Sequence, residues 1–153
     1  IRRQRQMCIR DSYNCTIIDL HDRSVIANIT DRNITSDLSI RTLRKALESQ
    51  PTIKEGLILH SDQGSQYTSK AFTEFCESVN VTQSMSKAGY PYDNAPRERY
   101  FNTLKNECTN LYEFTTEETL YQKVEEFAYV DYNHVRPHSY NGYRTPYEAR
   151  TAA

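Results

Sequence analysis

Short runs of apolar residues, separated by polar turns, predict several β-strands in this chain. Residues 15–20 and 24–29 are rich in β-branched side chains, and the polar segment 21–23 between them predicts a hairpin turn. Residues 56–60 form a continuous apolar run, which is typical of an interior strand buried on both faces. A further strand is expected over residues 81–85.

Apolar residues that recur three and four positions apart predict four helices. They are expected over residues 36–49, 69–78, 94–108 and 116–133, and Ser36 is the predicted N-cap of the first. The positions expected to face the core are Leu38, Leu43, Ala46 and Leu47, then Ala71, Phe72, Phe75 and Cys76, then Tyr100, Phe101, Leu104 and Cys108, and finally Leu120, Val124, Phe127, Ala128 and Val130. The order β-β-α-β-α-β, followed by two helices, predicts an α/β domain.

Length and composition fit one domain of ordinary size. The chain has 153 residues, of which 37% are hydrophobic and 25% are charged. No run approaches the roughly 20 apolar residues of a membrane helix, so we expect no membrane partner, and no signal peptide is visible. The four cysteines lack C-x-x-C spacing, which favours reduced thiols in a cytosolic protein. With 19 Lys+Arg against 20 Asp+Glu, nucleic-acid binding would depend on local basic patches.

The first twelve residues differ in composition from the rest. They hold four arginines and one aspartate, a net charge of +3, whereas the remaining 15 Lys+Arg and 19 Asp+Glu leave −4 for residues 13–153. The run from Arg2 to Ser12 has no helix or strand periodicity and resembles the translated end of a sequencing-library adapter. We therefore predict a non-native segment at 1–12, disordered or loosely placed, and a folded domain at 13–150. The alternative is a basic arm that binds nucleic acid.

Two acidic residues stand at positions that suit catalysis. Asp62 follows the predicted interior strand, where α/β sheets tend to present ligands and catalytic groups. Glu98 lies in the first turn of the third predicted helix and shares a polar face with Asn102 and Lys105. Alone, such a pair carries little weight, because twenty acids form many pairs and most are solvated surface charges.

Basic and amide side chains flank both acids. The basic residues around Glu98 form the kind of local patch that a phosphate-binding site requires. The glutamines after Asp62 could approach a DNA backbone, or could serve only the turn itself. The predicted DNA-binding residues are Lys105, Asn102, Arg97, Arg99, Gln63 and Gln66.

Three motifs carry a resemblance to a known enzyme family. They are Leu59-His60-Ser61-Asp62-Gln63-Gly64-Ser65-Gln66-Tyr67, the segment from Gly89 to Glu107, and Tyr132-Asn133-His134-Val135-Arg136-Pro137-His138. Their order and spacing are similar to those of transposases of bacterial insertion sequences, whose catalytic core is of the retroviral-integrase type. The resemblance covers residues 13–150 and implies a ribonuclease-H-like α/β fold, a mixed sheet of five strands flanked by helices.

The resemblance also implies a metal-dependent active site. In this family an Asp-Asp-Glu triad holds two divalent ions, Mg²⁺ or Mn²⁺. On that comparison Asp62 is the second Asp and Glu98 is the Glu, each of them catalytic and metal-binding, and Lys105 is similar to a lysine that contacts DNA near the reacting end. Carboxylate oxygens suit a hard ion such as Mg²⁺, and paired metals can activate the attacking hydroxyl and stabilise the leaving oxygen.

The first Asp of the triad has no counterpart here. In the family it lies on a first, central strand, and residues 2–12 stand where that strand would precede Tyr13. We therefore expect the native first strand to be missing. Asp19 is expected to be hydrogen-bonded structure and not a metal ligand. With two carboxylates for two divalent ions, metal binding should be weak and catalysis slight.

These observations lead to a hypothesis of DNA transposition, with metal-dependent cleavage and strand transfer at insertion-sequence ends, by a fragment that is itself inactive. The expected partners are transposon-end DNA, target DNA and further copies of the chain, in the bacterial cytoplasm at the nucleoid. The alternative is a non-catalytic relative that binds DNA or itself. A nuclease on the same fold is less favoured, because Arg136-Pro137-His138 resembles the transposase tail.

Histidines and tyrosines admit two interpretations each. His134 and His138 have H-x-x-x-H spacing, but Pro137 breaks the helix between them and favours a structural or DNA-facing role over zinc. His60 could orient the site or be a satisfied, partly buried histidine. Several tyrosines could stack on unpaired bases or pack with a wet hydroxyl. They are Tyr90, Tyr92, Tyr100, Tyr140, Tyr143 and Tyr147.

Overall fold

The computed structural model describes residues 6–7, 12–52, 55–87 and 94–152. The strands are β1 (Gln6–Met7), β2 (Ser12–Ile18), β3 (Val25–Asp31), β4 (Leu57–Ser61) and β5 (Val81–Met85). The α-helices are α1 (Ser36–Ser49), α2 (Ser65–Thr68), α3 (Lys70–Ser78), α4 (Ala95–Leu104), α5 (Glu117–Glu126) and α6 (Pro146–Thr151). Two π-helical segments, η2 (Lys105–Thr109) and η3 (Phe127–Val135), continue α4 and α5, and η4 (Ser139–Asn141) is a 3₁₀ turn.

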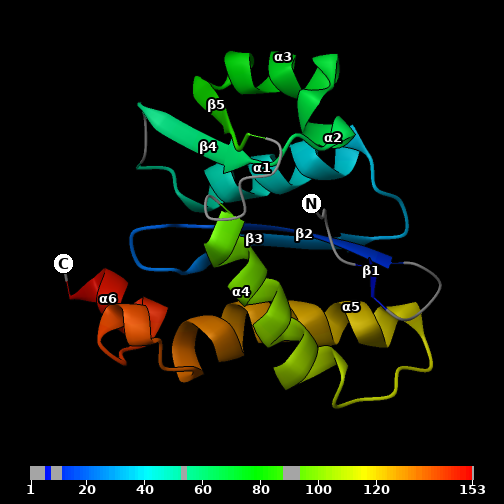
Figure 1. The fold of residues 1–153 in the computed structure, drawn as a ribbon, viewed down its shortest axis with the longest axis vertical. Helices are drawn as coiled ribbons and strands as arrows, with labels where there is room; N and C mark the ends of the chain where they lie inside the picture. Colours follow the sequence, from blue (N-terminus) through cyan, green and yellow to red (C-terminus); the bar gives the residue numbers. More distant parts are fainter. Residues whose placement is uncertain (1–5, 8–11, 53–54, 88–93, 153) are drawn as a thin grey trace.

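The elements form layers around the β2–β3 hairpin (Figure 1). This antiparallel pair crosses the middle of the molecule, with α1 packed on one face and α5 and η3 on the other. Beyond α1, the parallel pair β4–β5 lies with α2 and α3 at the top of the view. Helix α4 crosses the front of the lower layer and reaches up toward β4. The predicted α/β architecture, with sheet flanked by helices, is confirmed.

The strands divide into two separate sheets. β2 pairs with β3 and, at its start, with β1, whereas β4 pairs with β5. Among the described residues, no strand is bonded to both β2 and β4, so the single mixed sheet of five strands that the resemblance implies is not formed there. The prediction of a strand buried on both faces is wrong for β4, since Ile58 is 66% exposed. The physical reason is that only one face of β4 is packed: Leu57 and Leu59 lie against the cluster around Phe72, whereas Ile58 points to the opposite face.

Two apolar clusters hold the layers together. Below the β2–β3 sheet, Val25 packs with the buried faces of α4, α5 and η3, which include Tyr100, Leu104 and Val124. Above it, a smaller cluster joins α1, α3 and β5 around Phe72. Burial of these side chains fixes α4 against the sheet, and α4 carries Glu98.

Most predicted helix faces are confirmed, with corrections at the ends. α1 has the predicted bounds, but its N-cap is Thr35 and not Ser36, because the Thr35 hydroxyl accepts the backbone N–H of Leu38. The four-residue helix α2 was not predicted, since so short a segment has no apolar period. The prediction that Val130 faces the core is wrong, as it is 49% exposed. It lies in η3, where the wider π-helical turn shifts residues around the axis.

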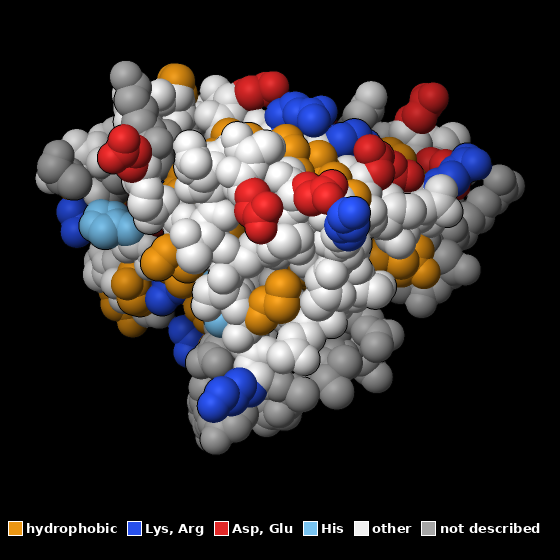
Figure 2. Space-filling model, turned by 90° about the horizontal axis from the view of Figure 1, so that it is seen from above, with side chains coloured by type: hydrophobic (Ala, Val, Ile, Leu, Met, Phe, Trp, Pro, Cys, Tyr) orange, Lys and Arg blue, Asp and Glu red, His pale blue; other side chains and the backbone are white. Residues whose placement is uncertain are grey.

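The surface carries charged side chains of both signs, as the nearly equal numbers of basic and acidic residues predict. On the face viewed from above in Figure 2, acidic and basic side chains lie next to one another. No helix formed by the described residues is long and apolar enough to cross a membrane. Cys15, Cys76 and Cys108 are free thiols and buried, while Cys8 lies outside the described residues.

The C-terminal tail is tied to the β2–β3 turn by a buried charge. Asp22 is 2% exposed and accepts hydrogen bonds from Ser24 Oγ at 2.6 Å and Arg150 Nε at 2.7 Å. Arg150 Nη2 also donates to Asp19 Oδ2 at 2.6 Å, so Asp19 has the hydrogen-bonded structural position expected for it. Burial alone would raise the pKa of Asp22, but the bonds from Ser24 and Arg150 outweigh it and lower the pKa below its ordinary value.

We expect stability to fall in acid through this group. The folded pKa of Asp22 lies below its unfolded value, so its contribution is present above about pH 4 and is lost as the pH drops through the folded pKa. Asp22→Asn should lower the free energy of unfolding at pH 7 by about 1.5–3 kcal/mol, the value of a hydrogen bond to a charged group. It should also reduce the fall in the free energy of unfolding between pH 7 and pH 3, which is the acid limb of the stability curve. Urea unfolding at pH 3 to 7 measures both effects. Asp37→Asn is the control, because that side chain is 72% exposed; an unchanged acid limb in Asp22→Asn would contradict the assignment.

Candidate active site

Asp62 lies directly after β4 and is held in a fixed orientation. Its Oδ1 accepts the backbone N–H of Gly64 at 2.9 Å, and its Oδ2 accepts Arg97 Nη1 at 2.8 Å. The side chain is 14% exposed. A backbone donor on one oxygen and a guanidinium donor on the other fix the orientation of this carboxylate through charge-assisted hydrogen bonds.

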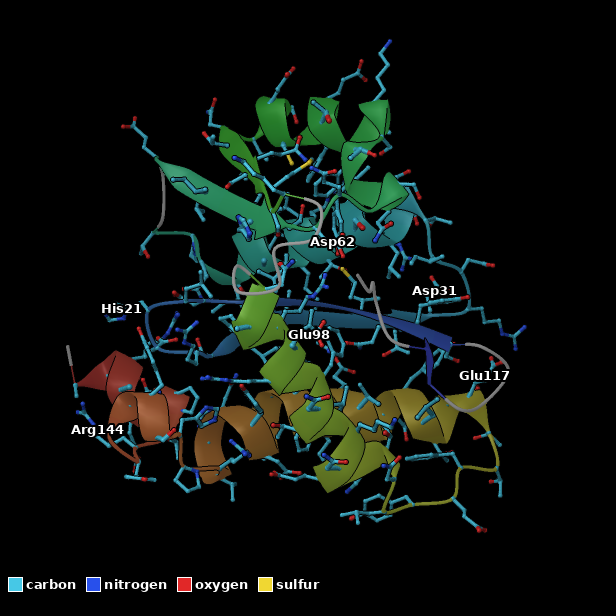
Figure 3. The ribbon with its side chains drawn as sticks, viewed as in Figure 1. His21, Asp31, Asp62, Glu98, Glu117 and Arg144 are labelled. Atoms are coloured by element: carbon cyan, nitrogen blue, oxygen red, sulfur yellow. The ribbon has the colours of Figure 1, made fainter. Side chains whose placement is uncertain are left out.

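Glu98 approaches the same guanidinium from α4. It lies in the first turn of the helix, behind Pro96, and is 40% exposed. Its Oε1 is 3.8 Å from Arg97 Nη2, so Arg97 stands between the two acids. The opposite face of α4 carries Tyr100, Phe101 and Leu104 into the core, which directs Glu98 away from it. Figure 3 shows Asp62 and Glu98 in the central part of the molecule, away from His21 and Arg144 at its edge.

The turn after Asp62 leaves no room for a side chain at Gly64. A Cβ there would lie 2.8 Å from the amide atoms of Gln66 and 2.9 Å from Asp62 Oδ1. Since real Cβ atoms keep a larger separation, any other residue would displace the two side chains. Gly64 therefore allows its backbone N–H to hold the Asp62 carboxylate.

Tyr67 and His60 lie on the two elements that flank Asp62 in the chain, α2 and β4. Burial, together with the neighbouring Cys15 and Asp62, raises the pKa of Tyr67 well above its ordinary value, so Tyr67 remains a neutral phenol. Its hydroxyl lies 3.7 Å from the Cys15 thiol. His60, two residues before Asp62, has both ring nitrogens within hydrogen-bond distance of Ser84 and Ser86 hydroxyls, at 3.0 and 3.1 Å. His60 thus takes the position of a satisfied, partly buried histidine.

The predicted DNA-binding residues divide by exposure. Arg99, Asn102 and Lys105 are exposed on α4 and η2, and Gln63 is exposed in the turn. Gln66 is 5% exposed, and Nε2 of its amide is buried without a hydrogen-bond partner, so a DNA-facing role for Gln66 does not fit its position. Arg97 is 21% exposed and pairs with Asp62, so a phosphate contact at this residue stays a prediction. Tyr90, Tyr92 and Asp93 lie outside the described residues.

The oxygen donors present suit a hard divalent cation. Two carboxylates from distant elements already converge on one positive group, and carboxylate oxygens are what Mg²⁺ and Mn²⁺ prefer. In the part of the chain that is described, no group of three or more His, Cys, Asp or Glu side chains is placed to hold a metal ion. The pair therefore offers the donor atoms that such a cation prefers, and Arg97 supplies the counter-charge in this structure.

Sequence reasoning missed the role of Arg97. The Arg97–Asp62 bond joins residues 35 apart, and nothing in either motif indicates that the guanidinium turns back toward β4. The sequence also left open whether His134 and His138 have structural or DNA-facing roles. His138 is 7% exposed with Nε2 3.1 Å from the Tyr132 carbonyl, whereas His134 lies against the Tyr147 ring, with ring centroids 4.5 Å apart.

Comparison with known proteins gives one family description. A family model described as an integrase core domain matches residues 4–91, and a second model with the same description matches residues 79–146. Together the matches include both Asp62 and Glu98.

Relatives of known sequence are proteins of insertion elements. The chain is 34% identical over 134 residues to the uncharacterized 31 kDa protein of insertion element IS600 from Shigella sonnei, covering 88% of this chain and 49% of that protein. It is 42% identical over 91 residues to the transposase for IS904 from Lactococcus lactis, covering 60% and 36%. It is 34% identical over 134 residues to the transposase InsF for IS3A from Escherichia coli, covering 88% and 46%. The chain thus spans about half, or less, of the length of these relatives.

Solved structures share the fold. The catalytic core domain of BIV integrase superposes with a TM-score of 0.74 at 19% identity, over 98% of this chain and 91% of that one. A chain of the simian T-cell lymphotropic virus intasome, solved in complex with PP2A regulatory subunit B56 gamma, also gives 0.74 at 16% identity, over 96% and 51%. The ribonuclease-H-like fold expected from the motifs is therefore confirmed.

Proposed function

The chain belongs to the integrase core domain family, and from this premise we propose that it is the catalytic core of an insertion-sequence transposase, which cuts and joins DNA at the ends of the element. The transposases among its relatives support this reaction. The observation that carries the proposal is that Asp62, after β4, and Glu98, on α4, both lie within ion-pair distance of the Arg97 guanidinium, at 2.8 and 3.8 Å.

In this proposal, Asp62 and Glu98 would hold divalent metal, Mg²⁺ or Mn²⁺. When bound, the metal supplies Lewis-acid activation of the attacking oxygen and stabilises charge on the leaving oxygen. Gly64 keeps Asp62 oriented through its backbone N–H, so the carboxylate does not need to reorganise. Arg97 must release Asp62 for metal to enter, because its guanidinium takes the shared position between the acids.

The exposed polar face that follows Glu98 is proposed to bind DNA. Arg99, Asn102 and Lys105 extend along α4 and the start of η2 from the same end of the helix as the acid. Lysine and arginine hold phosphates mainly by charge, which would position a DNA end against the acids without reading its sequence.

A third carboxylate is needed for full activity, and we propose that it comes from outside the described residues. Two carboxylates neutralise only half of the charge of a two-metal site, and Arg97 already satisfies the pair. This same observation favours the second candidate function, a non-catalytic relative that binds DNA through the fold alone. The chain by itself should accordingly show little or no strand transfer.

The test uses a chimera in which the upstream part of a matched transposase precedes Tyr13. With Mg²⁺ and a labelled donor end, the chimera should give joined products, resolved by size on a denaturing gel. Cleaved products without joining would indicate a nuclease. DNA binding without either product would favour the non-catalytic relative.

A further inference from the structure

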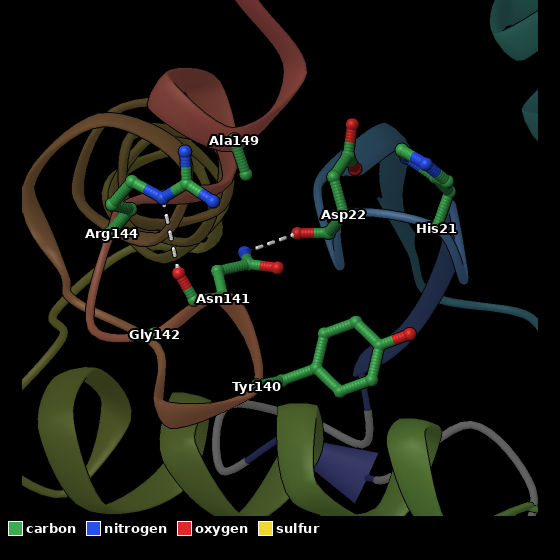
Figure 4. Close-up of a pocket in the computed structure, with 7 residues that line it drawn as sticks. All are labelled: His21, Asp22, Tyr140, Asn141, Gly142, Arg144 and Ala149. Atoms are coloured by element: carbon green, nitrogen blue, oxygen red, sulfur yellow. Dashed lines mark hydrogen bonds between the residues drawn. The ribbon is translucent and has the colours of Figure 1, made fainter. Parts of the chain in front are cut away.

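A hollowed surface lies at the tail of the chain, apart from the acidic pair. The β2–β3 turn and the segment around η4 meet there, because Asn141 Nδ2 donates to the Asp22 carbonyl at 2.7 Å. We name it the tail surface and define it by His21, Arg23, Tyr140, Tyr143 and Arg144. Figure 4 shows Tyr140, Arg144 and His21 around one hollow, which has a volume of about 680 Å³.

Aromatic rings are unusually exposed on this surface. Tyr140 is 56% exposed and Tyr143 is 76% exposed, although large apolar side chains are usually covered. The turn that presents them is rigid: Gly142 and Tyr143 have φ of 63° and 65°, and the backbone N–H of Tyr143 donates to the His138 carbonyl at 2.8 Å. Exposed rings on a fixed turn are available to stack on a flat ligand.

Positive charge on the tail surface is not neutralised by an ion pair among the described residues, and Asp22, which also lines the hollow, is bound by Arg150. The Arg23 guanidinium lies 4.0 Å above the Tyr140 ring, and its Nη1 is buried without a hydrogen-bond acceptor. Arg144 is exposed, and neither arginine forms an ion pair with an acid in the described part of the chain. The nearest acids are already engaged. Asp22 and Asp19 bind Arg150, and Glu148 closes the capping box of α6.

We propose that the tail surface binds unpaired nucleotides of DNA. Tyrosine rings offer stacking faces to bases, and arginines offer donors to phosphates, which is the combination used for single strands. Bases in a duplex are stacked on each other and cannot enter the hollow beside Tyr140. The inference rests on the proposed function for its choice of DNA, but it concerns a surface that the acidic pair does not share.

Fluorescence anisotropy with a labelled 20-nucleotide single strand and the matching duplex tests this surface. Tyr140→Ala combined with Tyr143→Ala should weaken single-strand binding about tenfold or more, since stacking on one aromatic is worth about 1–3 kcal/mol per base. Duplex binding should change much less. Tyr143→Ala alone should also weaken single-strand binding. Because Tyr143 is 76% exposed, its replacement should not disturb the fold, and thermal unfolding of both variants checks this.

The matched control is Tyr112→Ala. Tyr112 is 49% exposed and has Lys123 4.7 Å above its ring, but it lies outside the tail surface. Its loss should leave binding unchanged. Equal single-strand affinity of the double variant and the wild type would overturn the inference and indicate that the tail surface binds no DNA. A changed sedimentation coefficient of the double variant with unchanged DNA affinity would also overturn it and would indicate a protein partner. If the wild type binds no DNA of either kind, the inference and the proposed function both fail, whereas loss of strand transfer alone affects only the latter.

Discussion

Asp62→Asn and Glu98→Gln are each expected to abolish strand transfer in the chimera, with a loss of at least about 10³-fold. Each substitution removes one charged carboxylate from the proposed metal site while keeping the size of the side chain, and metal stabilisation of the transition state amounts to several kcal/mol. The reaction is followed by the yield of joined product. Because Asp62 and Glu98 are 14% and 40% exposed and stand outside the two apolar clusters, folding should persist.

The matched control for this loss is Glu74→Gln. Glu74 is an exposed acid on α3 that pairs with Lys70, remote in sequence from both motifs. Its replacement changes the net charge equally and should leave joining intact. Activity retained by Asp62→Asn or Glu98→Gln, with circular dichroism unchanged, would exclude them as the catalytic pair.

Arg97→Gln is expected to raise the affinity of the chain for Mn²⁺ about tenfold. In the wild type, a metal must displace the guanidinium from Asp62, and a hydrogen bond between charged groups is worth about 1.5–3 kcal/mol. Isothermal titration with Mn²⁺ measures the change without any need for DNA or activity. The variant should also unfold at a lower temperature without metal, since Asp62 then loses its guanidinium donor, and Mn²⁺ should bring the unfolding temperature back toward that of the wild type.

Arg99→Gln separates this effect from the general loss of one positive charge. Arg99 lies two residues along the same helix and is exposed. If Arg97→Gln and Arg99→Gln raise Mn²⁺ affinity equally, long-range charge accounts for the change and the competition at Asp62 is absent.

The spacing of apolar residues predicted those helices and strands whose formation depends mainly on neighbouring residues in the sequence. α1 and β5 have the bounds expected from apolar spacing, and Leu120, Val124, Phe127 and Ala128 are buried as expected. The exposure of Ile58 could not be predicted in this way, because burial of a strand face depends on which distant elements pack against it. The resemblance to transposases predicted the fold, and the comparisons confirm it.

The candidate site was predictable in part. Asp62 and Glu98 stood out by their motifs, whereas the guanidinium that joins them depends on the path of α4 relative to β4. Similarly, no sequence period links Arg150 to Asp19, which lie 131 residues apart and fix the tail. Long-range ion pairs form only when packing brings the chain segments together, so a single sequence does not reveal them.

Electron paramagnetic resonance of free Mn²⁺ in the presence of the chain tests the central claim most directly, that Asp62 and Glu98 form one cation site. The measurement compares Arg97→Gln with the same variant carrying Asp62→Asn or Glu98→Gln in addition. The account predicts one saturable site in Arg97→Gln that either carboxylate substitution removes. Binding that persists when either acid is replaced would contradict it.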